Sequence, residues 1–358
     1  MPLAGKTTLG VGGAARWFAV AHSAADIAAA EEWCTARGCQ LFVLGGGSNL
    51  VISDEGFDGL VLWINTRQLD FSETADGIML TAGAGELHRL GFEPTYEPSV
   101  FERQMFTAGC ARTRAAAFVN AWSDPSVAAL IAVRGGYGSV ELLPFLEQAP
   151  LHPPKLFVGY SDNTSLLTWL TLHRGIPALH GPMLDGRLAR GTTAYDEASF
   201  RALLVDGRGL SLAPEGVQVI KNGDATGVLA GGTMTQLTAS LGTPYSFIPP
   251  PGAILFLEDV NERPYRLHRM LTQLKLAGVL PHAAGLVFGE MRGCDEPDGG
   301  PTALDVIQEF AGDCRGPVVA GFPSGHTSGP CWTVPLGVQC RLLTHPRPAL
   351  IVEESPVE

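Results

Sequence analysis

The chain has 358 residues, enough for about two or three domains, and 46% of them are hydrophobic while 17% are charged. The formal net charge of −12 argues against nucleic acid or an anionic membrane as a partner. No apolar run approaches the ~20 residues of a membrane span, and the start lacks the apolar core of a signal peptide. The seven cysteines are scattered without a C-x-x-C pair, and the histidines form no zinc motif. We therefore expect a cytoplasmic protein without a metal.

Residues 1–85 predict a small α+β module. Ala24–Ala36 has a helix-forming composition, and four strand-like runs follow at Leu41–Leu44, Leu50–Ile52, Leu60–Ile64 and Ile78–Thr81. The first of these runs leads into Gly45-Gly46-Gly47-Ser48-Asn49. A backbone this bare can wrap a phosphate, but the same pattern also suits a plain turn.

The most informative stretch of the chain surrounds Ser161. Leu156–Val158 has strand character and ends in Gly159, Ser161 follows two residues later, and a segment with helical apolar spacing comes next. This is the layout of a nucleophile elbow, in which a helix N-terminus also faces a developing oxyanion. The usual G-x-S-x-G pattern is not met, because Asn163 takes the place of the second glycine. Taken alone, a Ser after a strand is more often a helix cap than a nucleophile.

A glycine-rich loop precedes the elbow. Arg112–Trp122 predicts a helix, and Val127–Val133 predicts a strand buried on both faces. That strand ends in Arg134-Gly135-Gly136-Tyr137-Gly138, at the edge of a parallel sheet where α/β proteins place their sites. The loop alone reads as a turn. Beside the elbow strand, however, it can supply backbone donors for acyl transfer.

A serine nucleophile needs a general base and a carboxylate that orients this base. Ala253–Leu257 predicts a strand that ends at Glu258, and Val318–Ala320 predicts a strand whose following loop carries His326. The chain order Ser, Glu, His also occurs in α/β-hydrolases. Either residue alone would be read as a surface side chain, but together with the elbow they form a candidate triad.

The stretch 184–215 is polar and rich in turns, so it is the best candidate for a linker. A second domain follows, with a strand at Ala284–Phe288 and helices near Pro264–Ala277 and Leu304–Ala311. We therefore predict an α/β protein with domains over residues 87–200 and 215–358, behind a module formed by residues 1–86.

From about residue 87 onward the chain resembles the LD-carboxypeptidases, the muramoyltetrapeptide carboxypeptidases. The matching stretches are R-G-G-Y-G, P-P-K-L-F-V-G-Y-S-D-N-T, H-G-P-M, L-A-G-G-T, L-F-L-E-D-V and G-F-P-S-G-H. The resemblance implies a flavodoxin-like domain with the elbow and a C-terminal α/β domain that brings the Glu and the His. Ser161 would be the nucleophile, His326 its base, and Glu258 the group that orients His326. The backbone N–H of Asp162, with that of Gly135 or Gly136, would form the oxyanion hole.

This resemblance implies a serine carboxypeptidase that removes the terminal D-Ala of murein tetrapeptide during peptidoglycan recycling. It implies a homodimer that needs no cofactor. One departure is Thr233, which stands where the family usually has Asn. Three rival interpretations stay open: an immunity-type hydrolase of peptidyl or aminoacyl nucleotides, a flavin-binding reductase remnant, and a hydrolase kept only as a binding protein.

The first 86 residues or so contain, in this order, the stretches T-L-G-V-G-G, L-F-V-L-G-G-G-S-N-L-V-I-S-D and T-A-G-A-G-E. With these motifs they resemble the start of UDP-N-acetylenolpyruvoylglucosamine reductase, a flavoenzyme. In that family the G-G-G-S-N loop lies at the FAD pyrophosphate, but the rest of the flavin domain is absent here, so we expect no bound flavin. The first strand of the carboxypeptidase family is also missing. We expect Ile78–Thr81 to replace it in the parallel sheet, followed by a short helix through Glu86–Leu90.

Overall fold

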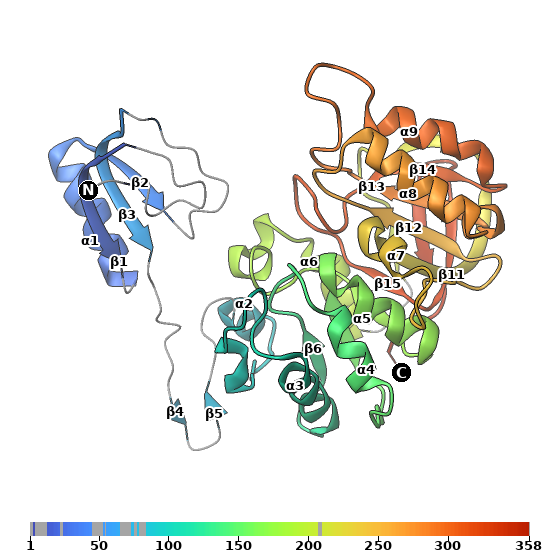
Figure 1. Ribbon diagram of the computed structural model, residues 1–358, viewed down its shortest axis with the longest axis horizontal. Coiled ribbons are helices and arrows are strands. Elements are labelled where there is room, and N and C mark those ends of the chain that lie inside the picture. Colours follow the sequence, from blue (N-terminus) through green and yellow to red (C-terminus); the bar gives the residue numbers. More distant parts are fainter. Residues whose placement is uncertain are drawn as a thin grey trace. The chain divides into compact units, whose positions relative to one another are not determined.

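The computed structural model describes residues 3, 13–21, 24–44, 53, 55–64, 73–74, 77–78, 84–206 and 210–357 (Figure 1). The chain divides into two compact units, Met1–Thr81 and Ala82–Glu358, which are described separately below. Among the described residues, no helix is both long enough and apolar enough to cross a membrane.

The first unit contains a three-stranded parallel sheet in the order β1-β3-β2. Its elements are β1 (Ala15–Ala21), α1 (Ala24–Arg37), β2 (Gln40–Leu44) and β3 (Phe57–Ile64). The predicted helix and the strands at Leu41–Leu44 and Leu60–Ile64 are confirmed. The predicted run Leu50–Ile52 and the loop Gly45–Asn49 lie outside the described residues.

The segment expected to open the carboxypeptidase sheet begins differently. β4 (Glu73–Thr74) and β5 (Gly77–Ile78) pair antiparallel as a two-stranded sheet, so Ile78 belongs to a hairpin. Residues 79–81 lie outside the described part of the chain. The expected short helix is present as α2 (Ala84–Arg89).

The second unit begins with a four-stranded sheet in the order β15-β8-β7-β6. Three strands are parallel, namely β6 (Ala129–Ile131), β7 (Leu156–Gly159) and β8 (Ala178–His180), while β15 (Val334–Leu336) is antiparallel to β8. The predicted helix at Arg112–Trp122 is α3 (Ala111–Ser123), whose Phe118 packs on Phe157 of β7 with 5.8 Å between ring centres. β6 is shorter than predicted. Among the described strands it pairs only with β7, along one of its two edges.

A larger sheet of eight strands follows in the order β10-β14-β13-β12-β11-β16-β17-β9. The four central strands are parallel: β11 (Asp224–Thr233), β12 (Ile254–Glu258), β13 (Gly285–Gly289) and β14 (Val318–Phe322). The outer strands are β9 (Ser211–Leu212), β10 (Gln218–Lys221), β16 (Gln339–Leu343) and β17 (Ala349–Val352). These strands confirm the α/β fold class and the predicted strands at Ala253–Leu257, Ala284–Phe288 and Val318–Ala320.

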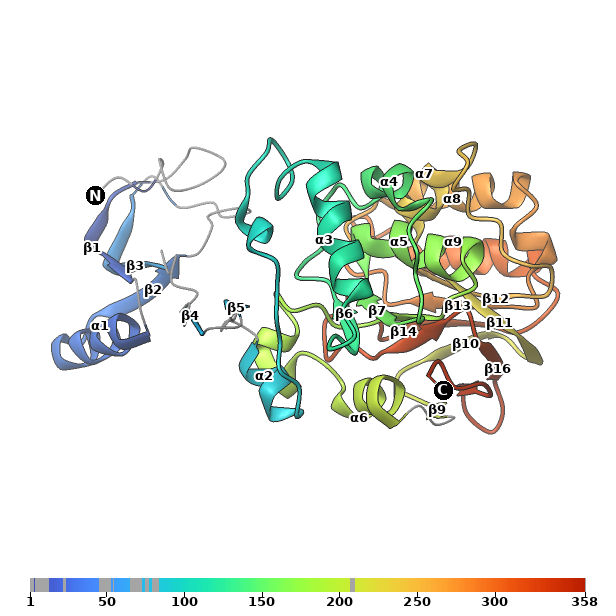
Figure 2. The same ribbon diagram turned by 90° about the horizontal axis from the view of Figure 1, so that it is seen from below.

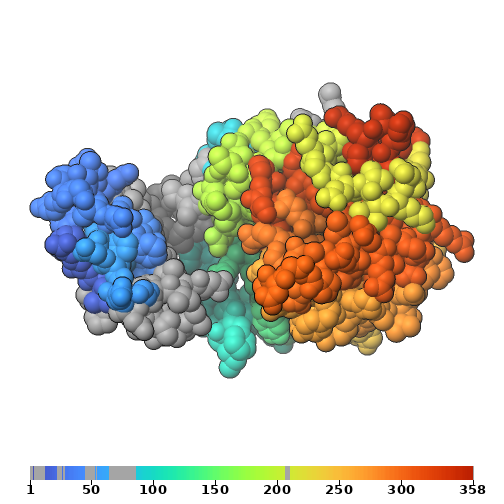
Figure 3. All heavy atoms as spheres, turned by 90° about the horizontal axis from the view of Figure 1, so that it is seen from above, coloured from blue at the N-terminus to red at the C-terminus, as the bar shows by residue number. Residues whose placement is uncertain are grey.

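Three helices cover one face of the large sheet and enclose its core (Figures 1 and 2). They are α7 (Met234–Ser240), α8 (Pro264–Leu276) and α9 (Ala303–Phe310), and the last two confirm the predicted helices. Every residue of β12 is buried, as expected for a strand between two parallel neighbours. The strands and helices coloured yellow to red form one continuous body in Figure 3.

The stretch 184–215, predicted as a linker, is folded. It contains η6 (Leu188–Thr193), α6 (Glu197–Arg201), η7 (Ala202–Asp206) and β9. Tyr195 and Phe200 are fully buried there, with ring centres 5.6 Å apart. The prediction was wrong because polarity and turn content do not reveal which aromatic side chains a segment buries. Moreover, β15 comes from the predicted C-terminal domain yet pairs with β8 of the first sheet. The proposed domain limits therefore remain predictions.

Short helices complete the second unit. They are η2 (Pro98–Phe101), η3 (Val140–Leu142), α4 (Leu143–Leu146), η4 (Ser161–Asn163), α5 (Thr164–Thr168), η5 (Trp169–His173), η8 (Leu280–His282) and η9 (Ala311–Asp313). Two of them, η4 and α5, follow β7 directly and form the helical side of the predicted elbow.

Candidate active site

The elbow at Ser161 has the backbone expected of a nucleophile turn. β7 ends at Gly159, and Ser161 opens η4 with a φ of 63°. A left-handed φ is unfavourable for a residue with a side chain, and such strained residues cluster at functional sites. The Ser161 side chain is partly exposed, whereas Asp162 and Asn163 behind it are buried. The conformation therefore supports an elbow rather than an ordinary helix cap.

Asn163, which replaces the second glycine of the usual motif, ties the elbow to the glycine-rich loop. Its side-chain amide donates hydrogen bonds to the carbonyl oxygens of Arg134 (3.1 Å) and Tyr160 (3.3 Å). In the other direction, the Ser139 N–H donates to Asp162 Oδ2 at 2.8 Å, and the Ser139 hydroxyl donates to the Asp162 carbonyl oxygen. The loop and the elbow are thus joined on both sides of Ser161.

Gly135 lies directly against the Ser161 hydroxyl. A Cβ atom at position 135 would come within 3.0 Å of Ser161 Oγ and 2.9 Å of its Cβ, so only glycine fits there. Gly136 has a φ of 115°, which also favours glycine. The backbone of the loop therefore approaches the nucleophile as the predicted oxyanion hole requires. The assignment of Asp162, Gly135 and Gly136 as its donors stays a prediction.

Glu258 and His326, predicted at two separate strand ends, are in contact. Glu258 ends β12, and His326 lies in the loop after β14. The Nδ1 atom of His326 lies 2.8 Å from Glu258 Oε2, and the backbone N–H of His326 donates to the same oxygen at 3.1 Å. The His326 ring also packs edge-on against Tyr160, the residue before Ser161, with 5.1 Å between ring centres. The structure thus brings Glu258 and His326 together and places the ring of His326 against the residue that precedes Ser161.

The other oxygen of Glu258 is held by Thr233 and lies near His180, two residues that the sequence did not single out for this role. The Thr233 hydroxyl donates a hydrogen bond to Glu258 Oε1, and His180 Nε2 lies 3.9 Å from the same atom. His180 is fully buried, and its Nδ1 lies 3.0 Å from Ser324 Oγ. Thr233 stands where the resemblance leads one to expect Asn, so its hydroxyl provides the donor at this position.

Burial and charge at the centre of the site act in opposite directions. Burial raises the pKa of Glu258, but the hydrogen bond and charge of His326, with smaller contributions from His180 and Thr233, lower it below its ordinary value. Burial lowers the pKa of His180 to about 4. His180 is therefore neutral at neutral pH, and Glu258 is the buried negative charge that faces His326.

The loop that carries His326 is held from the stretch predicted as a linker. Arg187 donates hydrogen bonds to the carbonyl oxygens of Gly325 (3.0 Å) and Thr327 (3.1 Å), which flank His326. Gly325 itself has no room for a side chain, because a Cβ atom would lie 2.7 Å from Glu258 Cδ. No local sequence signal points to Arg187, since its partners lie far along the chain.

This arrangement can perform nucleophilic acyl transfer. A partly exposed hydroxyl sits on a strained turn, backbone amides lie beside it, and an imidazole is oriented by a buried carboxylate. In the described part of the chain, no group of three or more His, Cys, Asp and Glu side chains could hold a metal ion.

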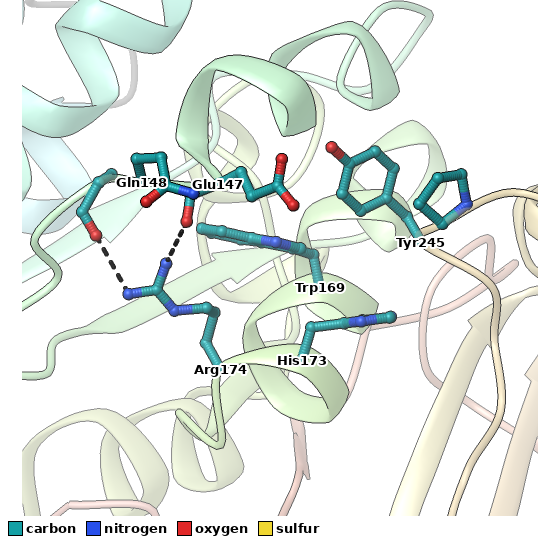
Figure 4. A pocket seen from close by; sticks show the side chains of 8 residues that line it. Glu147, Gln148, Trp169, His173, Arg174 and Tyr245 are labelled. Atoms are coloured by element: carbon teal, nitrogen blue, oxygen red, sulfur yellow. Dashed lines mark hydrogen bonds between the residues drawn. The ribbon is translucent and has the colours of Figure 1, made fainter.

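A separate pocket of about 420 Å³ lies away from these residues (Figure 4). Its lining comes from the end of α4, from η5 and from the loop after α7, and consists of Glu147, Gln148, Ala149, Trp169, His173, Arg174, Pro244 and Tyr245. Arg174 is engaged there with the carbonyl oxygens of Glu147 and Ala149. The pocket includes none of the predicted site residues.

Comparison with known proteins agrees with this geometry. The chain matches the models of the LD-carboxypeptidase N-terminal domain over residues 71–181 and of the LD-carboxypeptidase C-terminal domain over residues 226–342. It is 32% identical to the murein tetrapeptide carboxypeptidase of Pseudomonas aeruginosa, covering 63% of this chain and 75% of that protein. It is 30% identical to a Bacillus subtilis protein named probable murein peptide carboxypeptidase, covering 74% and 84%.

Solved structures show the same fold. The muramoyltetrapeptide carboxypeptidase of Oxalobacter formigenes is 27% identical, with a TM-score of 0.64 over 81% of this chain and 98% of that chain. The wild-type microcin C7 self immunity protein MccF is 24% identical, with a TM-score of 0.69 over 76% and 90%.

The amino-terminal module has a different relative. A stretch of 85 residues is 54% identical to UDP-N-acetylenolpyruvoylglucosamine reductase of Saccharopolyspora erythraea, covering 24% of this chain but only 23% of that enzyme. The predicted resemblance is therefore confirmed, while a flavin-domain-like structure for the module remains a prediction. Outside this module, the chain matches both LD-carboxypeptidase domains and the carboxypeptidase relatives. The protein therefore belongs to the LD-carboxypeptidase family and is a serine-type peptidase.

Proposed function

We propose that this protein hydrolyses the L,D-peptide bond to the terminal D-Ala of murein tetrapeptide. The observation that carries the proposal is the contact between His326 and Glu258 beside an elbow on which Ser161 has a left-handed φ. The relatives named as murein peptide and murein tetrapeptide carboxypeptidases supply the substrate class. We further propose that the protein acts in the cytoplasm, in peptidoglycan recycling, and as a homodimer.

The reaction follows from the roles of the three residues. Ser161 Oγ attacks the carbonyl carbon of the scissile bond while the free ring nitrogen of His326 takes the hydroxyl proton. Glu258 holds the ring and stabilises its positive charge. The oxyanion is bound by the backbone N–H of Asp162 and that of Gly135 or Gly136, each of which can contribute about 3 kcal/mol. His326 then gives its proton to the amine of D-Ala, which leaves, and a water molecule activated by His326 hydrolyses the acyl-enzyme.

The experiment is an assay for free D-Ala after incubation with a muramoyl tetrapeptide. Wild-type protein should release D-Ala, and Ser161→Ala should reduce the rate by at least about 10³-fold. Thermal unfolding of both proteins shows whether the variant is folded. Equal rates for the two proteins would contradict the role of Ser161.

A second candidate function is favoured by the fold comparison. Solved structures of MccF are described as complexes with aspartyl sulfamoyl adenosine and glutamyl sulfamoyl guanosine, with TM-scores of 0.70 and 0.69. Hydrolysis of an aminoacyl sulfamoyl adenosine, measured in parallel with hydrolysis of the tetrapeptide, distinguishes the two proposals. Hydrolysis of the aminoacyl sulfamoyl adenosine without release of D-Ala from the tetrapeptide would favour an immunity-type hydrolase.

A further inference from the structure

Three apolar side chains form an exposed cluster beside the glycine-rich loop: Met105, Phe106 and Tyr137. They are 89%, 75% and 55% exposed, respectively. The rings of Phe106 and Tyr137 meet edge to face, with 6.3 Å between their centres. Apolar side chains gathered in one exposed patch mark an interaction site more often than scattered ones do.

The backbone under this cluster is strained. Gln104 and Thr107 exchange two backbone hydrogen bonds of 2.9 Å and 2.6 Å, which leaves Met105 and Phe106 as the tip of a tight turn. Met105 has a φ of 33°. Tight turns of this size favour glycine, asparagine or aspartate where φ is positive, and polar residues at the tip. A methionine and a phenylalanine here are therefore unfavourable for both the backbone and solvation.

The turn is fastened to the loop that touches the nucleophile. The Thr107 methyl group packs against Gly138. A Cβ atom at position 138 would lie only 2.6 Å from this methyl group. Arg114 donates hydrogen bonds to the carbonyl oxygens of Gly138 (2.8 Å) and Gly109 (3.4 Å), so one side chain holds both segments. Tyr137 is two residues from Gly135, which packs against Ser161 Oγ. The cluster thus includes a residue of the same loop that packs against Ser161.

We propose that Phe106 and Tyr137 form an aromatic platform that binds the muramoyl sugar of the substrate. This inference rests on the proposed function. The C–H groups on the face of a pyranose ring carry partial positive charge and are attracted to the negative face of an aromatic ring. The side chains of the murein peptide are mostly small or charged, so the sugar is the substrate part that best matches an exposed aromatic surface. Continuity with Gly135 and Ser161 places the platform on the path of the substrate.

The test measures binding separately from catalysis. Ser161→Ala protein is titrated calorimetrically with muramoyl tetrapeptide and with the free tetrapeptide. We expect the muramoyl form to bind roughly three- to tenfold more tightly, the gain typical of one aromatic contact. Adding Phe106→Ala should bring the ratio of the two affinities close to one, and Phe106→Trp should keep it. Phe145→Ala is the matched control, because Phe145 is also an exposed ring (42%) but belongs to α4.

Several outcomes overturn the platform. They are equal affinities for the two ligands, no binding of either ligand, or a ratio that Phe106→Ala leaves unchanged. A change of molar mass in Phe106→Ala by light scattering, with the ratio unchanged, would assign the cluster to a second copy of the chain instead. The D-Ala assay on wild-type protein stands apart from these results. If wild-type protein releases no D-Ala while the binding ratio behaves as expected, the proposed reaction fails and the platform stands.

Discussion

The substitution Glu258→Gln isolates the charge that faces His326. In the wild-type structure, His326 Nδ1 lies 2.8 Å from Glu258 Oε2. Glutamine has nearly the same shape as glutamate, so its carbonyl oxygen can still accept a hydrogen bond from His326 Nδ1. Its amide group would face Thr233, whose hydroxyl can also accept a hydrogen bond. The contacts are therefore kept, and the negative charge is lost.

The size of the effect follows from the separation of the charges. Two unit charges about 4 Å apart attract each other by about 4 kcal/mol at the effective dielectric constant that describes such sites. The imidazolium forms only when His326 has taken the proton of Ser161, so this energy stabilises the transition state more than the ground state. We therefore expect kcat for D-Ala release to fall by roughly 10³-fold, with little change in KM.

The matched control is Glu309→Gln. Glu309 also pairs with a histidine, His268, at 3.1 Å, but the side chains of His268 and Glu309 are 44% and 64% exposed. Exposed ion pairs contribute little, so this variant should keep kcat within about twofold. A loss of less than tenfold in Glu258→Gln, in protein that unfolds at the wild-type temperature, would refute the role of this charge.

Three further predictions concern the donor to Glu258, the pH dependence and the amino-terminal module. Thr233→Val removes a hydrogen bond to a buried carboxylate, so the free energy of unfolding should fall by about 1.5–3 kcal/mol. Thr233→Asn should recover most of what Thr233→Val loses, because its amide group can donate a hydrogen bond to Glu258. If it does not, the Thr233 hydroxyl does more than donate this hydrogen bond. The pKa of Glu258 lies below its ordinary value of 4.5, so this carboxylate stays charged at any pH above 4.5. Above pH 5, protonation of Glu258 should therefore make no contribution to the pH dependence of kcat/KM, and a slope of two in log kcat/KM there would contradict the lowered pKa. Residues 82–358 form a compact unit and should fold and release D-Ala without residues 1–81. Loss of folding in circular dichroism would support the expectation that the amino-terminal module completes the sheet.

The three residues proposed as catalytic could be named from the sequence because each carries a local signal. Ser161, Glu258 and His326 all follow an apolar run of strand length, and the carboxyl ends of parallel strands gather at one edge of a sheet. The α/β class follows from the same alternation of strands and helices. A local pattern therefore predicts that these side chains lie at the carboxyl edge of a sheet, even before the strand order is known.

The residues around them could not be predicted, because their contacts are set by tertiary packing. Arg187 holds the carbonyl of Gly325 across a separation of 138 residues, and no spacing in the sequence reveals this contact. His180 reads as an ordinary strand end, yet it lies fully buried behind Glu258. The role of Thr233 was likewise hidden, since a threonine at a strand end has no single preferred partner.

The bonds between the elbow and the glycine-rich loop have a consequence for how this chain could arise by fusion. β6, which carries the loop, pairs among the described strands only with β7. The side chains of Asn163, Ser139 and Asp162 nevertheless join the loop to the elbow directly. A short ring of bonds thus fixes the spacing between Ser161 and the backbone of the glycine-rich loop. A change in the chain before β6 can therefore leave these bonds between the elbow and the loop intact.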